Sequence, residues 1–163
     1  MSAAISKWLG EFGEGHVKAI LEGRGYQALA LQNASGNGID IIGVKTAHGR
    51  ETALVVEVKA TGGKRYPSVR GAQGDLGKWA RSRLVSAASG TGRYRALSSA
   101  DRSLAARLLK AIDAGTPVAA VLVAVRNIGR GVPDASITGV TRVPKVGAVA
   151  RPLTRRRPRA RFR

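Results

Sequence analysis

The sequence lacks cysteine, and histidine occurs only as His16 and His48. Disulfides and thiolate metal sites are therefore excluded, and two distant histidines without a metal-ligand pattern argue against a histidine metal centre. Long apolar runs are also missing, because the longest, at residues 118–125, is too short to cross a bilayer and the first residues lack a signal peptide's apolar stretch. No G-x-x-x-x-G-K-[ST] motif occurs, so ATP use is not supported. We expect a soluble protein without a membrane span.

Acidic residues are few, and the charge imbalance lies in one part of the chain. The 28 Lys and Arg outnumber the 10 Asp and Glu, which gives a formal net charge of +18. Residues 1–60 contain six of each kind, so residues 61–163 contain the other 22 basic and the other 4 acidic residues. Nucleic acid is the first candidate partner, because each neutralised phosphate releases counterions. An acidic protein or an anionic membrane surface would be attracted by the same positive charge.

The first part of the chain predicts a helix followed by three strands. Ser6 or a neighbour can cap a helix that runs to about residue 24, where Gly23 and Gly25 end it. Strands are expected at residues 26–31, 39–44 and 53–60, with a turn at 33–38 and a hairpin connection at 45–50.

The second part predicts two helices and two strands after a glycine-rich basic loop at residues 61–72. The helices are expected at 76–88 and, capped by Ser98 or Ser99 and ended by Gly115 and Pro117, up to about residue 114. The apolar run at 118–125 predicts a strand buried on both faces, with buried helix as the alternative, and 135–142 predicts an edge strand. The order of elements indicates an α/β domain at residues 1–143 with a central mixed sheet flanked by helices, followed by a basic, Arg-rich, flexible tail at 144–163.

The third predicted strand carries two opposite charges. In the segment LVVEVK at residues 54–59, the two-residue period places Glu57 and Lys59 on one face. Leu54, Val56 and Val58 lie on the other. An exposed strand that alternates Glu and Lys would give the same triplet, so the neighbouring strand matters.

Asp40 lies among branched apolar residues in the second predicted strand. A charge in such a strand is costly to bury unless it is paired or binds metal. Carboxylates on adjacent strands also repel each other, and a hard divalent cation with oxygen ligands relieves that repulsion. Asp40 and Glu57 therefore predict a site for Mg²⁺ or Mn²⁺.

Glu14 on the first helix is the expected third metal ligand, directly or through water. Alternatively, Glu14 is a solvated residue on the surface of the helix and binds no metal. Glu11, one helical turn earlier, is the residue that could be mistaken for Glu14 as the ligand. The cation would polarise a scissile phosphate and lower the pKa of a water, while Lys59 would orient that water or stabilise charge on phosphorus. The expected catalytic residues are Glu14, Asp40, Glu57 and Lys59, and the expected reaction is phosphodiester hydrolysis without a covalent intermediate. Gln73, Lys64, Arg65 and Arg70 are the expected substrate-binding residues.

These residues carry a resemblance to a known superfamily. Glu14, the segment GNGID that ends at Asp40, and EVK at residues 57–59 together resemble the PD-(D/E)XK restriction-endonuclease-like nucleases over roughly residues 9–90. The segment GEGHVKAILEGRGY is similar to the Holliday-junction-resolvase and Mrr-like branches, in which the matching helix Glu helps to build the metal site. The resemblance implies that role for Glu14. Gly-Ile-Asp stands here in place of the family's Pro-Asp.

A narrower resemblance is to the nuclease toxin domains of bacterial contact-dependent inhibition and type VI secretion effectors. Those domains often show an NGID-like strand, an EVK strand and then a Gln and a Trp, matched here by Gln73 and Trp79. The resemblance implies an effector that is secreted or injected, acts in the target-cell cytoplasm and is neutralised by an acidic immunity protein.

Several readings stay open from the sequence alone. DNA is the expected substrate. The alternative substrate is tRNA, because the same metal chemistry can hydrolyse the phosphodiester bonds of DNA and of RNA. A cytoplasmic housekeeping resolvase or repair nuclease would share the same fold. The non-enzymatic alternative is a basic nucleic-acid-binding module in which Glu57 and Lys59 only pair with each other.

Overall fold

A computed structural model of the chain describes residues 3–32, 38–67 and 75–146. Residues 33–37 of the turn expected at 33–38, the candidate residues Arg70 and Gln73, and residues 147–163 of the expected tail lie outside the described residues. Gly38 already belongs to strand β2. The described elements, in chain order, are α1 (Ala3–Gly23), β1 (Gln27–Gln32), β2 (Gly38–Ala47), β3 (Arg50–Ala60), α2 (Leu76–Ser89), the short 3₁₀ helix η1 (Gly92–Tyr94), α3 (Ser99–Ala114), β4 (Val118–Arg126) and β5 (Asp134–Arg142).

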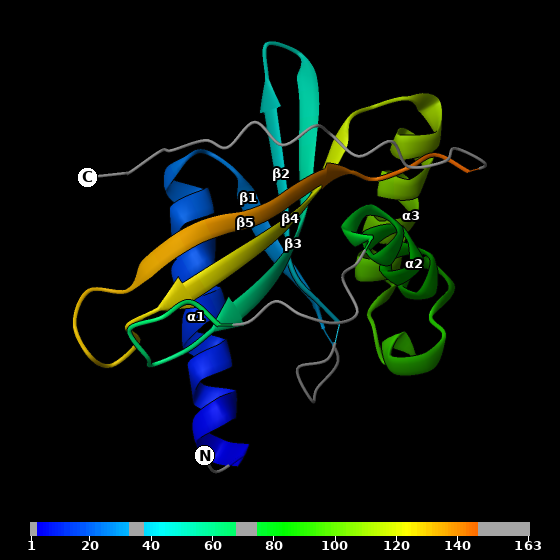
Figure 1. The fold of residues 1–163 in the computed structure, drawn as a ribbon. Helices are drawn as coiled ribbons and strands as arrows, with labels where there is room; N and C mark the ends of the chain where they lie inside the picture. The colour runs from blue at the N-terminus through cyan, green and yellow to red at the C-terminus, as the bar shows by residue number, and fades with distance from the viewer. Residues whose placement is uncertain (1–2, 33–37, 68–74, 147–163) are drawn as a thin grey trace.

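The five strands form one mixed sheet in the order β1-β2-β3-β4-β5. Strands β3 and β4 are parallel, and the other neighbouring pairs are antiparallel. Helix α1 lies against one face of the sheet, and the α2–η1–α3 segment, which connects β3 to β4, lies against the other (Figure 1). The predicted α/β fold with a mixed sheet flanked by helices is confirmed at this level.

Each face of the sheet has its own hydrophobic core, and β4 contributes to both. On the α1 side, Val121, Val123 and Val125 pack with α1 residues such as Leu9, whereas Leu122 packs under α2 and α3 on the other side. This burial on both faces confirms the prediction for residues 118–125 and decides it in favour of a strand. No helix in the described ranges is long and apolar enough to cross a membrane.

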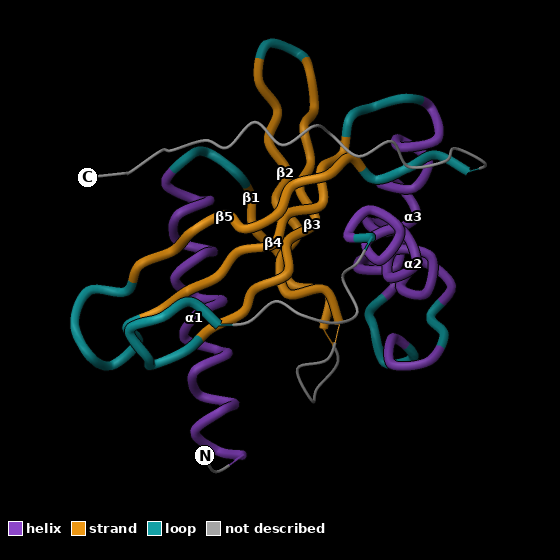
Figure 2. Tube along the Cα trace, in the orientation of Figure 1, coloured by secondary structure: helices purple, strands orange, loops and turns teal. Residues whose placement is uncertain are grey.

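Two local predictions were wrong for identifiable reasons. Helix α1 begins at Ala3, so Ser6 lies inside it rather than capping it, because the alanines before Ser6 are strong helix formers. The connection expected at 45–50 is only the two-residue turn His48–Gly49, since Ala47 still pairs with Arg50. Both turn residues have positive φ, 51° and 71°, which matches the twist of an antiparallel hairpin. Figure 2 shows this hairpin extending beyond the body of the sheet.

The close approach of α1 to β3 depends on Gly13. A Cβ atom at Gly13 would lie 2.5 Å from the Cβ of Ala60 and 3.6 Å from the side chain of Val58. Because Gly13 has no side chain, the helix can rest directly on the strand that carries Glu57. The next residue along the helix is Glu14, so this contact also fixes how far Glu14 lies from the sheet.

We predict opposite effects for alanine at two glycines of α1. Alanine is favoured over glycine inside a helix by about 1 kcal/mol. Gly10→Ala, which meets nothing within 4 Å, should therefore raise the thermal unfolding midpoint. Gly13→Ala should lower it, because α1 must move away from Ala60. Thermal unfolding followed by circular dichroism measures both, and a Gly13→Ala protein as stable as Gly10→Ala would contradict the packing described.

Candidate active site at the fork of the sheet

The candidate site lies where β2 separates from β3. Their pairing runs from Ala47↔Arg50 to Ile41↔Val56. Beyond Ile41, β2 remains paired with β1, through Leu31↔Ile39, while β3 remains paired with β4 as far as Ala60↔Val125. The lower ends of β2 and β3 diverge in Figure 1 accordingly. The sheet therefore forks beside Asp40 and Glu57.

Asp40 lies in the fork and uses both carboxylate oxygens. Its Oδ2 accepts a hydrogen bond of 2.7 Å from the backbone N–H of Val58, and its Oδ1 accepts one of 3.0 Å from Nε2 of Gln32. Burial, together with the charge of the nearby Glu57, raises the pKa of Asp40 to about 7, while the hydrogen bond from Val58 acts to lower it. Asp40 is thus a half-buried carboxyl group that forms no ion pair with a described Lys or Arg side chain.

Glu57 and Lys59 project from β3 on the same face as Val55, toward α2 and α3. The alternate residues Val56 and Val58 pack on the α1 side, so the predicted alternation of this strand is confirmed. Glu57 is the one charged residue that is buried in the described part of the chain, at 8% exposure. Nζ of Lys59 lies 2.5 Å from Oε1 of Glu57 and compensates its charge.

Glu14 reaches the same place from α1. Burial raises its pKa, the hydrogen bond from Gln32 lowers it, and the charge of Glu57 raises it. Glu14 and Asp40 line a hollow of about 220 Å³ between α1 and the sheet. Glu11, in contrast, has a side chain that is 64% exposed and pairs with Lys7, so Glu14 is the residue of the helix that belongs to the carboxylate group.

Gln32 is a site residue that the sequence did not single out. Its Nε2 lies 3.1 Å from Oε2 of Glu14 and 3.0 Å from Oδ1 of Asp40, so one amide group bridges the helix and the sheet. The predicted strand ended one residue earlier, at Leu31, which left Gln32 next to a turn. One signal in the sequence could have pointed to Gln32. It is a polar residue at the end of a strand, and the next strand along the chain carries Asp40.

The loop after β3 is held by residues that sequence reasoning also missed. Arg126 donates a 3.0 Å hydrogen bond to the carbonyl of Lys64, and its guanidinium lies 4.4 Å from the ring centroid of Tyr66. Asp134 accepts hydrogen bonds from both Tyr66 and Arg126. These contacts fix the backbone of the loop, while the predicted substrate-binding residues Lys64 and Arg65 remain exposed on it.

The carboxylates have the donor type that a hard divalent cation prefers. The raised pKa of Asp40 comes first from burial and then from the charge of Glu57, and a cation would relieve that repulsion. As placed, Gln32 stands between Glu14 and Asp40, and Lys59 contacts Glu57. In the described ranges, no three or more His, Asp or Glu side chains are already arranged around a common point for a metal. Asp40 and Glu57 could hold a cation, and Glu14 could join them if the Gln32 amide turned away.

Comparison of the chain with protein-family models, with curated proteins and with solved structures finds no match.

We predict a pH dependence of stability that comes from Asp40. Its folded-state pKa of about 7 lies above its ordinary value of 3.8, so between these values the folded protein holds a proton that the unfolded chain has lost. The free energy of unfolding should therefore fall as the pH rises from 4 to 7, by up to about 4 kcal/mol at about 1.4 kcal/mol per pKa unit. Glu14 acts in the same direction, whereas the lowered pKa values of Asp113 and Asp134 act only at more acidic pH.

Urea unfolding in EDTA at several pH values measures this effect. Asp40→Asn should be more stable than the parent protein at pH 8 and should approach it near pH 4.5. The Glu22→Gln variant, on the same helix with a side chain that is 50% exposed, is the matched control and should keep the pH dependence of the parent. Parallel curves for the parent and Asp40→Asn proteins would refute the assignment.

Proposed function

We propose that this chain is a divalent-metal-dependent endonuclease of the PD-(D/E)XK class that hydrolyses DNA. The observation that supports the proposal best is the convergence at the fork of the sheet. Asp40 comes from β2, Glu57 and Lys59 come from β3, and Glu14 comes from α1, with Gln32 linking two of the carboxylates. Glu14, Asp40, Glu57 and Lys59 are the residues on which the resemblance drawn from the sequence rests.

The proposed roles follow from the surroundings of each side chain. Asp40 and Glu57 hold the cation, and Glu14 assists from the helix. A bound Mg²⁺ or Mn²⁺ would supply Lewis acidity to the scissile phosphate and make a water more acidic. Lys59, which lies beside Glu57, would orient the attacking water or stabilise the charge that develops on the phosphate.

DNA is proposed as the substrate because the basic residues of the chain offer a charge-driven affinity for phosphate backbones. Those charges do not separate DNA from RNA, so tRNA is the alternative to be tested beside it. The resemblance to effector toxins extends the proposal to an antibacterial role, with an acidic immunity protein that covers the basic surface. Isolation of the neighbouring gene product and a measured inhibition of cleavage would test that extension.

One observation favours a second function, that of a basic nucleic-acid-binding module. Lys59 already compensates Glu57, and Asp40 already has two hydrogen-bond donors, so the charges at the fork are partly satisfied without a metal. A pure binding module would retain nucleic acid without cleaving it. Its affinity would also be indifferent to neutral substitutions at the fork.

We predict metal-dependent cleavage that requires the fork residues. Purified protein is incubated with plasmid DNA, linear DNA and total tRNA, in Mg²⁺, in Mn²⁺ or in EDTA. Asp40→Asn, Glu57→Gln and Lys59→Met should each lower the cleavage rate by roughly 100-fold or more while nucleic-acid binding persists. The exposed Lys110→Met variant removes the same charge from α3 and should keep the parent rate.

The substrate that is cleaved identifies the nuclease as DNA- or RNA-directed. Cleavage that survives both Asp40→Asn and Lys59→Met would refute the site. Binding of all three nucleic acids without cleavage in either metal would favour the binding module instead.

A further inference from the structure

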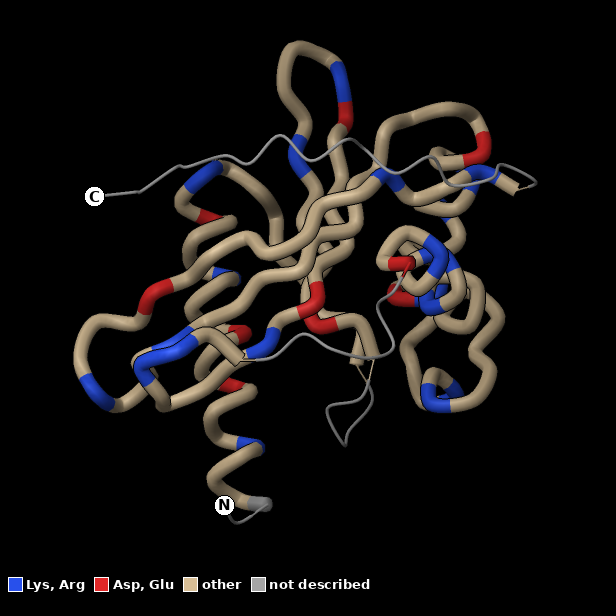
Figure 3. The backbone as a smooth tube through the Cα atoms, viewed as in Figure 1, with Lys and Arg blue, Asp and Glu red and all other residues tan. Residues whose placement is uncertain are grey.

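The α2–η1–α3 segment carries a strong excess of positive charge. Residues 75–115 contain eight Lys and Arg against three Asp. The segment covers the face of the sheet toward which Glu57 projects. Figure 3 shows basic positions spread over this segment, with a few acidic ones among them, and other acidic positions near the lower ends of the central strands.

Part of this charge is already neutralised by ion pairs. The pairs join Lys78 to Asp75, Arg81 to Asp113, and Arg107 to Glu51. Arg83, Arg93 and Arg95 take part in no ion pair with another described residue. These three cations lie on the last half of α2 and around η1, so they form one group along the chain.

The backbone around η1 is held firmly in place. Tyr94 is fully buried, and Leu97 is 8% exposed. The guanidinium of Arg102 donates a 2.6 Å hydrogen bond to the carbonyl of Arg95 and passes so close to Gly90 that a Cβ there would lie 2.6 Å from it. Because these contacts fix η1 and the residue after it, Arg93 and Arg95 project from a rigid base and lose little backbone entropy when they bind an anion.

The segment around η1 shares a hydrophobic cluster with the strands that carry the fork residues. Tyr94 belongs to the same hydrophobic cluster as Leu31 and Ile39, which are the chain neighbours of Gln32 and Asp40. Burial raises the pKa of Tyr94, Arg83 and Arg93 lower it, and Glu57 and Asp40 raise it, so the phenol lies within electrostatic range of both sets of charges. The hydroxyl of Tyr94 has no hydrogen-bond partner within the described ranges.

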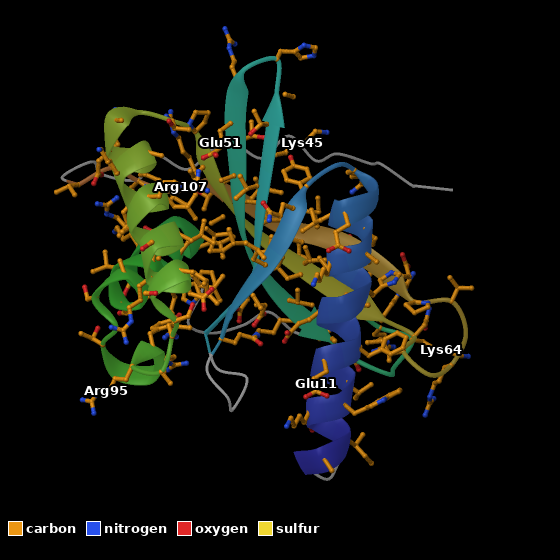
Figure 4. The ribbon with its side chains drawn as sticks, turned by 180° about the vertical axis from the view of Figure 1, so that it is seen from behind. Glu11, Lys45, Glu51, Lys64, Arg95 and Arg107 are labelled. Carbon is orange, nitrogen blue, oxygen red and sulfur yellow. The ribbon has the colours of Figure 1, made fainter. Side chains whose placement is uncertain are left out.

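Cations are needed at this position if a polyanion is to approach the fork. Asp40, Glu57 and Glu14 repel phosphate, and Lys59 alone does not offset three carboxylates. Arginine binds phosphate oxygens through a planar fork of N–H donors. In Figure 4, Arg95 and Lys64 lie on opposite sides of the molecule near its lower end, with the fork between them.

We propose that Arg83, Arg93 and Arg95 form a phosphate-binding surface, called here the phosphate-binding wall. This surface binds a nucleic-acid backbone and positions it at the fork, on the side opposite the loop that carries Lys64 and Arg65. The inference deepens the proposed function, on which it rests for the reaction that the seated backbone undergoes. A strand held between the two walls would lie across the end of β3, with a phosphate next to Glu57 and Lys59.

The test measures binding without cleavage. A fluorescently labelled DNA duplex is titrated in EDTA at several NaCl concentrations with the parent protein, Arg93→Gln/Arg95→Gln, and the matched control Arg107→Gln/Lys110→Gln. Both double variants remove two positive charges, but Arg107 lies beside Glu51, away from Arg95 (Figure 4). Circular dichroism verifies that each variant is folded.

Two lost phosphate contacts should reduce the slope of log affinity against log salt by roughly 1.8, at about 0.9 per contact, and should lower the affinity at least ~10-fold at 0.1 M salt. Arg83→Gln should reduce the slope by about half as much, and the control pair should leave it within ~0.5 of the parent value. Equal slopes for the two double variants would overturn the wall. If Arg93→Gln/Arg95→Gln lost as much affinity for polyglutamate as for DNA, the wall would also be overturned. These arginines would then bind an acidic polypeptide as well as they bind phosphate.

The failure of this inference and that of the proposed function give different results. A protein that never cleaves, yet shows the selective change in slope, retains the phosphate-binding wall and loses the nuclease assignment. A protein that cleaves through Asp40 and Lys59, with an unchanged slope, retains the nuclease and loses the wall.

Discussion

The hydrogen bond from the backbone N–H of Val58 to the carboxylate of Asp40 is the interaction on which the candidate site depends. Val58 lies just beyond the last paired residues of β2 and β3, so its amide would otherwise be buried without a partner at the fork. The side chain of Asp40 accepts the hydrogen bond that a paired strand would otherwise accept at this position. The same contact brings Asp40 next to Glu57, and the repulsion between them is the electrostatic cost of the arrangement.

The surroundings of the fork limit that cost in different ways on the two faces of the sheet. On the α1 side, the amide of Gln32 donates to both Glu14 and Asp40. On the side of α2 and α3, Lys59 compensates Glu57. The carboxylates therefore stay close without being fully neutralised, and a divalent cation would have more to contribute here than at a solvated acidic cluster. The nuclease proposal rests on this incomplete compensation.

The sequence predicted the order and type of the elements well because its signals were local. The apolar alternation around Glu57 and the cap at Ser98, whose hydroxyl accepts from the N–H of Asp101, needed no knowledge of the tertiary structure. The roles of Gln32 and Tyr94 depend on which segments meet across the fork, and residues distant in sequence leave no such local signal. The extent of the β2–β3 hairpin was underestimated because its outer residues are polar and pair without contributing to either core.

The connection between β3 and β4 also bears on the order in which the parts of the protein assemble. Strands β1, β2 and β3 are consecutive in the sequence and pair with one another in that order, whereas residues 61–117 separate β3 from its partner β4. Short loops cost less entropy to close, so the three-stranded part can form early and β4 joins it late. Asp40, Glu57 and Gln32 all lie in the early part, and a folding intermediate that lacks β4 would already hold them near one another.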